Sequence, residues 1–246
     1  MVQDRPENPR IRTKINRWND HDDSMVFGIL ERLRADDISP DQTLCELLDA
    51  FQEMDLLSSL SEEIAEAEGS DDQLWLIRRH VDHRRYTVLL CPVKEGEVHP
   101  PHGHHNLISL QIVLKGQIHL REYDRVSRNE NGTLVLIGRR DAVLGPGDVF
   151  VASDEKNNVH WFCGHDGPTM IFNINVRGYA PTVFEEDEDG FGRRYLDPTR
   201  VRADNLIEAD EFDKDEAERR FQGKPVSGFD FPADARPVSE PLRISL

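Results

Sequence analysis

The sequence predicts a mainly β protein with an α-helical N-terminal extension. From Ser24 to about residue 70, apolar residues recur at the three- and four-residue spacing of amphipathic helices. Beyond Leu74 they occur in short alternating runs separated by turn residues, which is typical of β-strands. Because no helical pattern separates these runs, we expect an antiparallel sandwich or barrel.

Composition limits the classes of partner. The 246 residues carry a formal net charge of −17, which argues against nucleic acid or an anionic membrane as a partner. No apolar run approaches the roughly 18 residues of a membrane span, and the first thirty residues are charged. Cys45, Cys91 and Cys163 form no CxxC pair. We therefore expect a cytoplasmic protein whose partners are small molecules or proteins.

Three helices are expected in the extension, which we place at residues 1–72. The first starts near Ser24. The second opens at residues 39–42, Ser-Pro-Asp-Gln, which supply a capping residue, a proline at the first helical position and a glutamine three residues after the cap. A third runs from about residue 56 to 67, where an acidic, glycine-containing stretch breaks it.

The barrel is expected over residues 73–198. Short strands are predicted at 86–90, 107–114, 117–123, 133–137, 149–152, 159–163 and 170–176. Turn residues punctuate them, as at Asn131-Gly132. The remaining residues, 199–246, are expected to form a short helix near residues 210–221 and a proline-containing tail.

Histidines at the start of one strand suggest a metal site. The stretch 99–105 reads HPPHGHH, and within it His102 and His104 project to the same side of an extended chain, whereas His105 points away. A third imidazole is available from His160 on a later strand. Neutral imidazoles suit iron, copper, nickel and zinc, so this ligand set does not name the metal.

These residues resemble the cupins. Gly96, the His102-Gly103-His104 triplet and Gly116 are similar to the first cupin motif. Gly147-Asp148 followed by His160 resembles the second motif, with a longer gap than usual. The resemblance covers roughly residues 74–198 and implies a cupin jelly-roll barrel.

One difference from the usual cupin motif points to a particular branch of the cupins. Ser109 stands where most cupins have a glutamate ligand, which leaves three histidines. This pattern is similar to the thiol dioxygenase branch, which includes cysteine dioxygenase, cysteamine dioxygenase and the plant cysteine oxidases. The resemblance implies Fe(II) bound by His102, His104 and His160, and oxidation of a small thiol by O2 to a sulfinate.

The resemblance also implies roles for other residues. Gly178-Tyr179-Ala180-Pro181 is similar to a stretch of the cysteamine branch and would make Tyr179 the pocket phenol. Asn173 sits where the cysteamine and plant enzymes have an aspartate. Arg78, like an early-strand arginine of cysteine dioxygenase, is a candidate for binding a substrate carboxylate, and a surface ion pair is the alternative.

Alternation along residues 107–114 divides that strand into two faces. Gln111 shares a face with Ser109 and is a candidate to hydrogen-bond a ligand or substrate. The other face is aliphatic and must be covered; its residues are Ile108, Leu110, Ile112 and Leu114. The N-terminal helices or the second subunit of a homodimer would cover it. His99 and His105 are expected at the surface or behind the metal ligands.

Two other functions remain open. A three-histidine cupin dioxygenase can instead cleave a carbon–carbon bond of a diketone or an aromatic acid. A non-catalytic cupin would hold a metal or ligand without turnover. The expected partners of the enzyme are a small-molecule substrate and O2, with no nucleic acid and no membrane.

Overall fold

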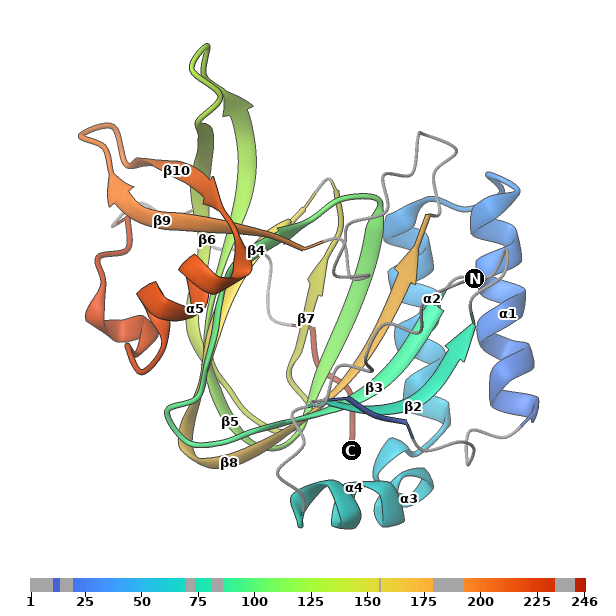
Figure 1. The fold of residues 1–246 in the computed structure, drawn as a ribbon. Helices are drawn as coiled ribbons and strands as arrows, with labels where there is room; N and C mark the ends of the chain where they lie inside the picture. Colours follow the sequence, from blue (N-terminus) through green and yellow to red (C-terminus); the bar gives the residue numbers. More distant parts are fainter. Residues whose placement is uncertain are drawn as a thin grey trace, which may run out of the picture.

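The computed structural model describes residues 11–13, 20–69, 74–80, 86–154, 156–178, 193–232 and 242–246. Within these residues, ten strands join in one sheet (Figure 1). They are β1 (Ile11–Thr13), β2 (Leu74–His80), β3 (Tyr86–Val93), β4 (Val98–His104), β5 (Leu107–Arg128), β6 (Leu134–Leu144), β7 (Val149–Ala152), β8 (Val159–Arg177), β9 (Arg193–Val201) and β10 (Leu206–Phe212).

The sheet closes into a barrel. Neighbouring strands follow the order β8, β4, β9, β10, β6 and β5, and β5 pairs again with β8. β7 and β3 lie on the outer sides of the β5–β8 pair, and β2 and β1 continue the sheet beyond β3. The mainly β barrel predicted from the sequence, with helices at its N-terminus, is confirmed.

β5 and β8 are longer than the sequence predicted. Each was expected as two short strands, but β5 runs for 22 residues and β8 for 19. Their mutual register shifts between Val113 and Gln117, around Gly116, which has a φ of +73°. A bulge of this kind bends a strand without ending it. The turn residues that were expected to end each strand therefore mark a bend, and β5 pairs with β8 on both sides of it.

The barrel extends beyond residue 198, where the sequence placed its end. β9 continues to Val201, and β10 pairs with both β9 and β6. Helix α5 (Lys214–Phe221) begins only after β10, with Asp213 as its N-cap. The acidic residues of β10 hid its strand pattern in the sequence, because a run of like charges is unfavourable in a strand. In the fold these charges are balanced by basic residues of other segments, as where Arg200 of β9 pairs with Glu208 and Asp210.

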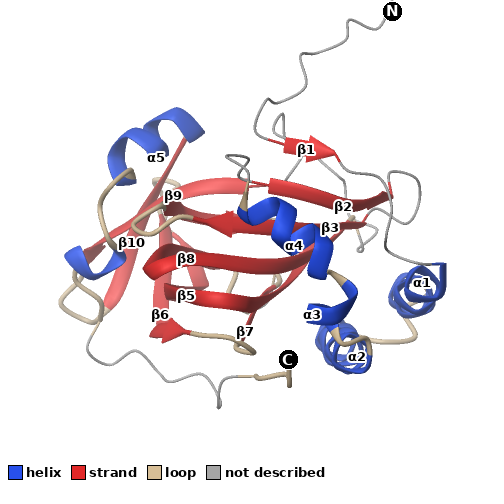
Figure 2. Ribbon diagram, turned by 90° about the horizontal axis from the view of Figure 1, so that it is seen from below, coloured by secondary structure: helices blue, strands red, loops and turns tan. Residues whose placement is uncertain are grey.

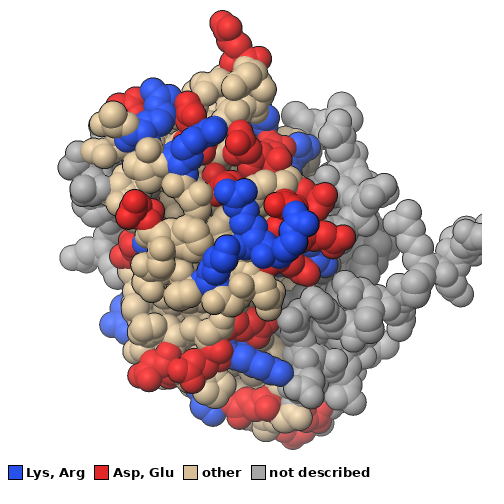
Figure 3. Space-filling view, turned by 60° about the vertical axis from the view of Figure 1, so that its left-hand side comes forward, with Lys and Arg blue, Asp and Glu red and all other residues tan. Residues whose placement is uncertain are grey.

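The outer face around β9 and β10 therefore carries both signs of charge. Arg128 and Arg194 both pair with Glu211 of β10, and Arg220 of α5 pairs with Asp197 of β9. Figure 3 shows basic and acidic side chains next to one another on this side of the molecule. Exposed ion pairs of this kind each contribute little to stability, but they keep a charged strand compatible with the sheet.

Helices α1 (Asp20–Arg34), α2 (Pro40–Glu53), α3 (Leu56–Ser59) and α4 (Ser61–Glu68) lie against the β2–β3–β8–β5 part of the sheet (Figure 2). The predicted start of α2 is confirmed, since Ser39 and Gln42 form a capping box. A single-turn 3₁₀ helix, η1, spans Val226–Gly228. None of the helices in the described residues is long and apolar enough to cross a membrane.

The aliphatic face of β5 is covered within the chain, as one of the two predicted arrangements requires. Its four aliphatic side chains belong to one buried cluster with Leu30 of α1 and with Leu47 and Phe51 of α2. The Phe51 ring meets Phe172 of β8 edge to face, with centroids 5.0 Å apart. The opposite face of β5 is thereby left to line the barrel interior.

Candidate metal centre and substrate cavity

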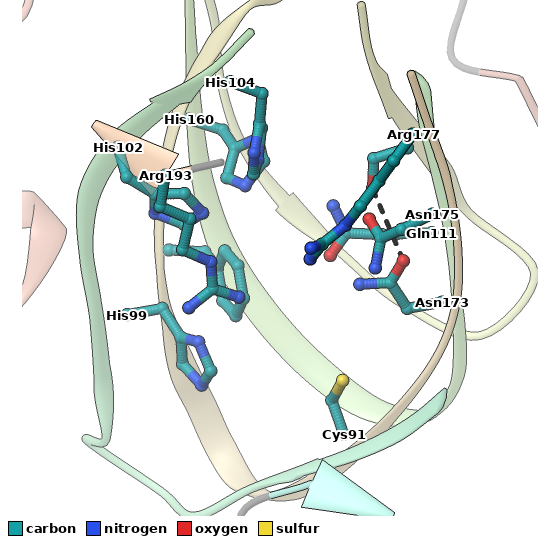
Figure 4. A pocket seen from close by; sticks show the side chains of 12 residues that line it. Cys91, His99, His102, His104, Gln111, His160, Asn173, Asn175, Arg177 and Arg193 are labelled. Carbon is teal, nitrogen blue, oxygen red and sulfur yellow. Dashed lines mark hydrogen bonds between the residues drawn. The ribbon is translucent and has the colours of Figure 1, made fainter. Parts of the chain in front are cut away.

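Three histidines converge inside the barrel. His102 of β4 pairs directly with His160 of β8, so both side chains lie on the same face of the sheet. His104 follows two residues after His102 and shares that face. One ring nitrogen from each residue lies within 4.8 Å of the others, and all three residues are buried (Figure 4). The structure thus brings together the three residues that the sequence predicted as metal ligands.

The chemistry of these nitrogens fits a metal. Nδ1 of His102 lies 2.7 Å from the Pro100 carbonyl oxygen, and since a carbonyl only accepts, Nδ1 carries the proton and Nε2 keeps its lone pair. Nδ1 of His104 and Nδ1 of His160 are buried without a hydrogen-bond partner among the described residues. Neutral, buried imidazoles with free lone pairs are suitable ligands for a divalent first-row metal.

Burial keeps the three imidazoles neutral. It lowers the pKa of His160 to about 3, with a smaller contribution from the charge of Arg193. Burial also holds the pKa values of His102 and His104 well below the usual range, and nearby His160 and Arg193 act in the same direction. Metal binding requires deprotonated imidazole, so it does not compete with a proton here near neutral pH.

The cavity beside the histidines is polar, and its described lining contains no carboxylate. Ser109 faces this cavity and donates a hydrogen bond to Oδ1 of Asn173 over 3.4 Å. No aspartate or glutamate therefore supplements the imidazoles among the described residues. The lining consists of Cys91, His99, His102, His104, Ser109, Gln111, His160, Phe162, Asn173, Asn175, Arg177 and Arg193.

Neutral polar side chains form the wall opposite the histidines. In the pairing of β5 with β8, Ser109 lies opposite Asn175 and Gln111 opposite Asn173. The four residues therefore share one face, and Figure 4 shows the three amides across the cavity from the histidines. Ser109, Gln111 and Asn173 were predicted site residues. Asn175 was missed, although it follows Asn173 by two residues and so shares its face.

Two arginines complete the cavity. Arg177 follows Asn175 by two residues on β8, and Arg193 enters because β9 pairs with β4 opposite His104. The charge of Arg193 contributes to the lowered pKa values of His102, His104 and His160. The alternation of β8 contained the signal for Arg177. The position of Arg193 depends on the pairing of β9 with β4, two segments far apart in the sequence, and no local sequence pattern predicts this pairing.

His99 and Cys91 also line the cavity. His99, expected at the surface or behind the ligands, stacks on Phe162 with ring centroids 4.4 Å apart and planes 15° apart. Burial, with a contribution from Arg193, lowers the pKa of His99 to about 3. Cys91 lies away from the histidines at the far end of the cavity (Figure 4), where burial raises the pKa of its thiol to about 12. This thiol therefore stays protonated.

The remaining predicted residues lie elsewhere or are not described. Tyr179 lies outside the described residues, and so does the side chain of Arg78, whose backbone belongs to β2. Tyr195 of β9 is buried beside His102, with ring centroids 6.0 Å apart. His105 is exposed, as predicted, with Nδ1 3.8 Å from Asp154.

Comparison with known proteins gives likenesses of structure only. No family model and no curated protein matches the chain. KdgF from Halomonas sp. is 17% identical, with a TM-score of 0.32 over 42% of this chain and 78% of that chain. Bacillus subtilis oxalate decarboxylase is 14% identical, with a TM-score of 0.28 over 42% of this chain and 23% of that chain.

Procruciferin, an 11S globulin from Brassica napus, is 12% identical, with a TM-score of 0.29 over 37% of this chain. The present chain spans only 20% of the length of that globulin. The assignment of function therefore rests on this chain's own residues.

Proposed function

We propose that the protein is a non-haem Fe(II) dioxygenase that oxidises a small thiol to a sulfinate. The observation that carries this proposal is the composition of the site: three neutral imidazoles converge in a cavity whose described lining has two guanidinium groups and no carboxylate. A site of this charge favours an anionic sulfur over a neutral ligand. The overall reaction adds both atoms of O2 to a thiolate, R–S⁻ + O2 → R–SO2⁻.

Fe(II), held by His102, His104 and His160, would supply the binding of thiolate and O2 and the transfer of oxygen to sulfur. The chain's own residues supply attraction and orientation. Arg177 and Arg193 raise the local positive potential and so favour the thiolate over the thiol. Phe162 contributes an apolar surface that limits the water beside the histidines.

The amide wall orients the substrate. Gln111, Asn173 and Asn175 each carry both hydrogen-bond donors and acceptors, and they face the histidines across the cavity. Because Ser109 donates to Asn173, the hydroxyl helps to fix the direction of one amide. Oriented, buried amides of this kind hold a polar substrate in one pose relative to the imidazoles.

The same wall favours a second candidate function, cleavage of a carbon–carbon bond in a diketone or an aromatic acid. Such a substrate presents several oxygens, which the three amides and the two arginines can hydrogen-bond together. It would bind the metal through oxygen and not through sulfur. The two candidates therefore differ in the atom that reaches the metal.

Oxygen uptake by the iron-loaded protein separates these candidates. We expect uptake with at least one member of a panel of small thiols, one O2 consumed per thiol, and a mass increase of two oxygen atoms in the product. The His160→Ala variant, prepared in the same way, serves as the control and should show no uptake. Uptake with a diketone or an aromatic acid, and with no thiol, would contradict the thiol proposal and support the second candidate.

We also propose that the protein works in the cytoplasm with iron as its metal. All three cysteines are free, with Cys45 exposed and the other two buried. Free thiols and a ferrous centre both suit a reducing compartment. Elemental analysis of protein purified without added metal tests the choice of iron.

A further inference from the structure

His99 faces the cavity because β4 contains a bulge. It precedes His102 by three residues, and in a regular strand these two side chains would lie on opposite faces. In the register with β8, however, His99 pairs with Phe162 and His102 pairs with His160. β4 therefore advances three residues while β8 advances two. The extra residue belongs to Pro100-Pro101, and proline suits a bulge because it has no N–H to pair.

The imidazole of His99 is held in a defined position. Its ring lies parallel to Phe162, which lines the same cavity. Figure 4 shows His99 on the wall that carries the three converging histidines and Arg193, facing the amides. His99 is not one of the three residues whose ligand atoms converge. His99 therefore lines the cavity but is not one of the candidate metal ligands.

One nitrogen of His99 lacks a partner. Nε2 is buried and makes no hydrogen bond with the described residues. Buried polar atoms in folded proteins are nearly always hydrogen-bonded, and an exception at a cavity wall points to a partner that the ligand supplies. Arg193 lines the same wall, and its positive charge favours an anionic ligand group here.

We propose that His99 is a substrate-binding residue in the tautomer that carries its proton on Nε2, and that this N–H donates a hydrogen bond to an anionic group of the small molecule in the cavity. This inference rests on the proposed function, in that the cavity must hold a small molecule beside a metal. It adds a fourth histidine to the site with a separate role, because the first three bind the metal and His99 recognises the substrate.

The test uses the full chain loaded with Co(II), whose visible absorbance reports ligand binding. The probes are mercaptoacetate and acetylacetonate, titrated without oxygen. His99→Phe keeps an aromatic ring against Phe162 but removes the hydrogen bond, whereas His99→Gln places an amide nitrogen near the position of Nε2. We expect one Co(II) per chain in each variant. Probe affinity should fall about tenfold in His99→Phe and stay within about threefold of the parent in His99→Gln.

The matched control is His105→Phe, which changes an exposed histidine of the same stretch and should leave probe affinity unchanged. If His99→Phe does not fold, His99→Leu provides the same comparison. The proposal is overturned if the Phe or Leu variant binds both probes like the parent, if it loses Co(II), or if His99→Gln is equally weak. If the parent binds acetylacetonate and not mercaptoacetate, the thiol proposal is refuted. The role of His99 is then tested by comparing the affinities of the parent, His99→Phe and His99→Gln proteins for acetylacetonate. Binding of neither probe would overturn this inference.

Discussion

His102 and His160 are direct partners in the antiparallel pairing of β4 with β8, and their ring centroids lie 4.4 Å apart. This single pair joins two distant segments of the chain into one site. Each strand then adds residues by alternation, with His104 following on β4 and Phe162 on β8. The site is therefore built on strands and not on loops, which keeps its nitrogens in fixed positions.

The first prediction concerns metal content. We expect one first-row metal ion per chain, and we expect that replacing His102, His104 or His160 with alanine abolishes binding. Each replacement leaves two converging imidazoles, and the described lining offers no carboxylate to take the place of the lost ligand. Elemental analysis after dialysis measures the ratio. His105→Ala is the control and should keep its metal; full occupancy in the His160→Ala protein would refute the ligand assignment.

The sequence was sufficient to predict that His102, His104 and His160 converge, because their signal is local. The spacing of His102 and His104 needs only the two-residue period of a strand, and His160 lies at the start of a later strand pattern. The same alternation places Gln111 beside Ser109. It was also predictable that the aliphatic face of β5 must be covered, because a large apolar face is rarely left exposed. The sequence left open whether the N-terminal helices or a second subunit covers it.

The sequence was not sufficient to place a residue or strand whose position depends on long-range strand pairing or on a bulge. Arg193 reaches the cavity only through the β4–β9 pairing, and β10 joins the barrel although it is acidic. His99 was expected at the surface or behind the metal ligands, but the bulge of β4 turns it to the same face as His102. The signal that could have corrected this is Pro100-Pro101, since two prolines within a strand favour a bulge.

The second prediction tests the helical cover of the barrel. Phe51 of α2 is almost fully buried against Phe172 of β8. We expect Phe51→Ala to lower the free energy of unfolding by about 3 to 5 kcal/mol, because it removes a large apolar contact and leaves a cavity. Urea denaturation measures the change. Val143→Ala, at a residue 45% exposed, is the control and should change stability by less than about 0.5 kcal/mol.

The third prediction concerns the bend of β5. Gly116 has a φ of +73°, and a Cβ at this position would lie 2.4 Å from the carbonyl oxygen of Pro168. Gly132 also has a positive φ, of +88°, but a Cβ there would meet nothing within 4 Å. We expect Gly132→Ala to cost about 1 to 2 kcal/mol and Gly116→Ala about 2 kcal/mol more, because only the latter adds a clash with the backbone of β8. Equal costs, measured by denaturation, would show that this contact does not constrain the bend.

The fourth prediction is an acid sensitivity of the metal-free protein. Burial lowers the pKa of His160 in the folded chain from 6.5 to about 3, so between these values the unfolded chain binds more protons. Stability therefore falls as the pH falls below about 6.5. For His160 alone, the loss between pH 7.5 and pH 5 is about 2 kcal/mol.

Unfolding of chelator-treated protein at a series of pH values measures this loss. His160→Gln should make the dependence shallower by about the share of one histidine, because the glutamine takes up no proton, whereas His99, His102 and His104 still do on unfolding. The matched control is His105→Gln, at an exposed position, and it should leave the dependence unchanged. A parent protein and a His160→Gln variant with the same pH dependence would show that His160 is not the residue responsible.

The last prediction tests whether the absence of a carboxylate matters to function. Ser109 is 1% exposed and lines the cavity. The sequence resemblance to the cupins would place a glutamate ligand at this position. We expect Ser109→Glu to retain iron, because iron accepts a carboxylate oxygen as readily as an imidazole nitrogen. Thiolate affinity should fall at least about tenfold, since a buried negative charge repels an anionic sulfur at close range. In the Ser109→Gln variant the side chain is nearly the same size as glutamate but carries no charge. We expect this variant to bind thiolate more tightly than the Glu variant.

Anaerobic titration of the iron-loaded proteins with small thiols, followed by absorbance and electron paramagnetic resonance, gives the three affinities. A Glu variant that binds thiols like the Gln variant would show that charge at this position does not control sulfur binding. The parent protein provides the wider test, because its spectrum must change with at least one thiol for the proposed reaction to begin. If a diketone or an aromatic acid perturbs that spectrum and no thiol does, the thiol dioxygenase proposal fails and carbon–carbon cleavage takes its place.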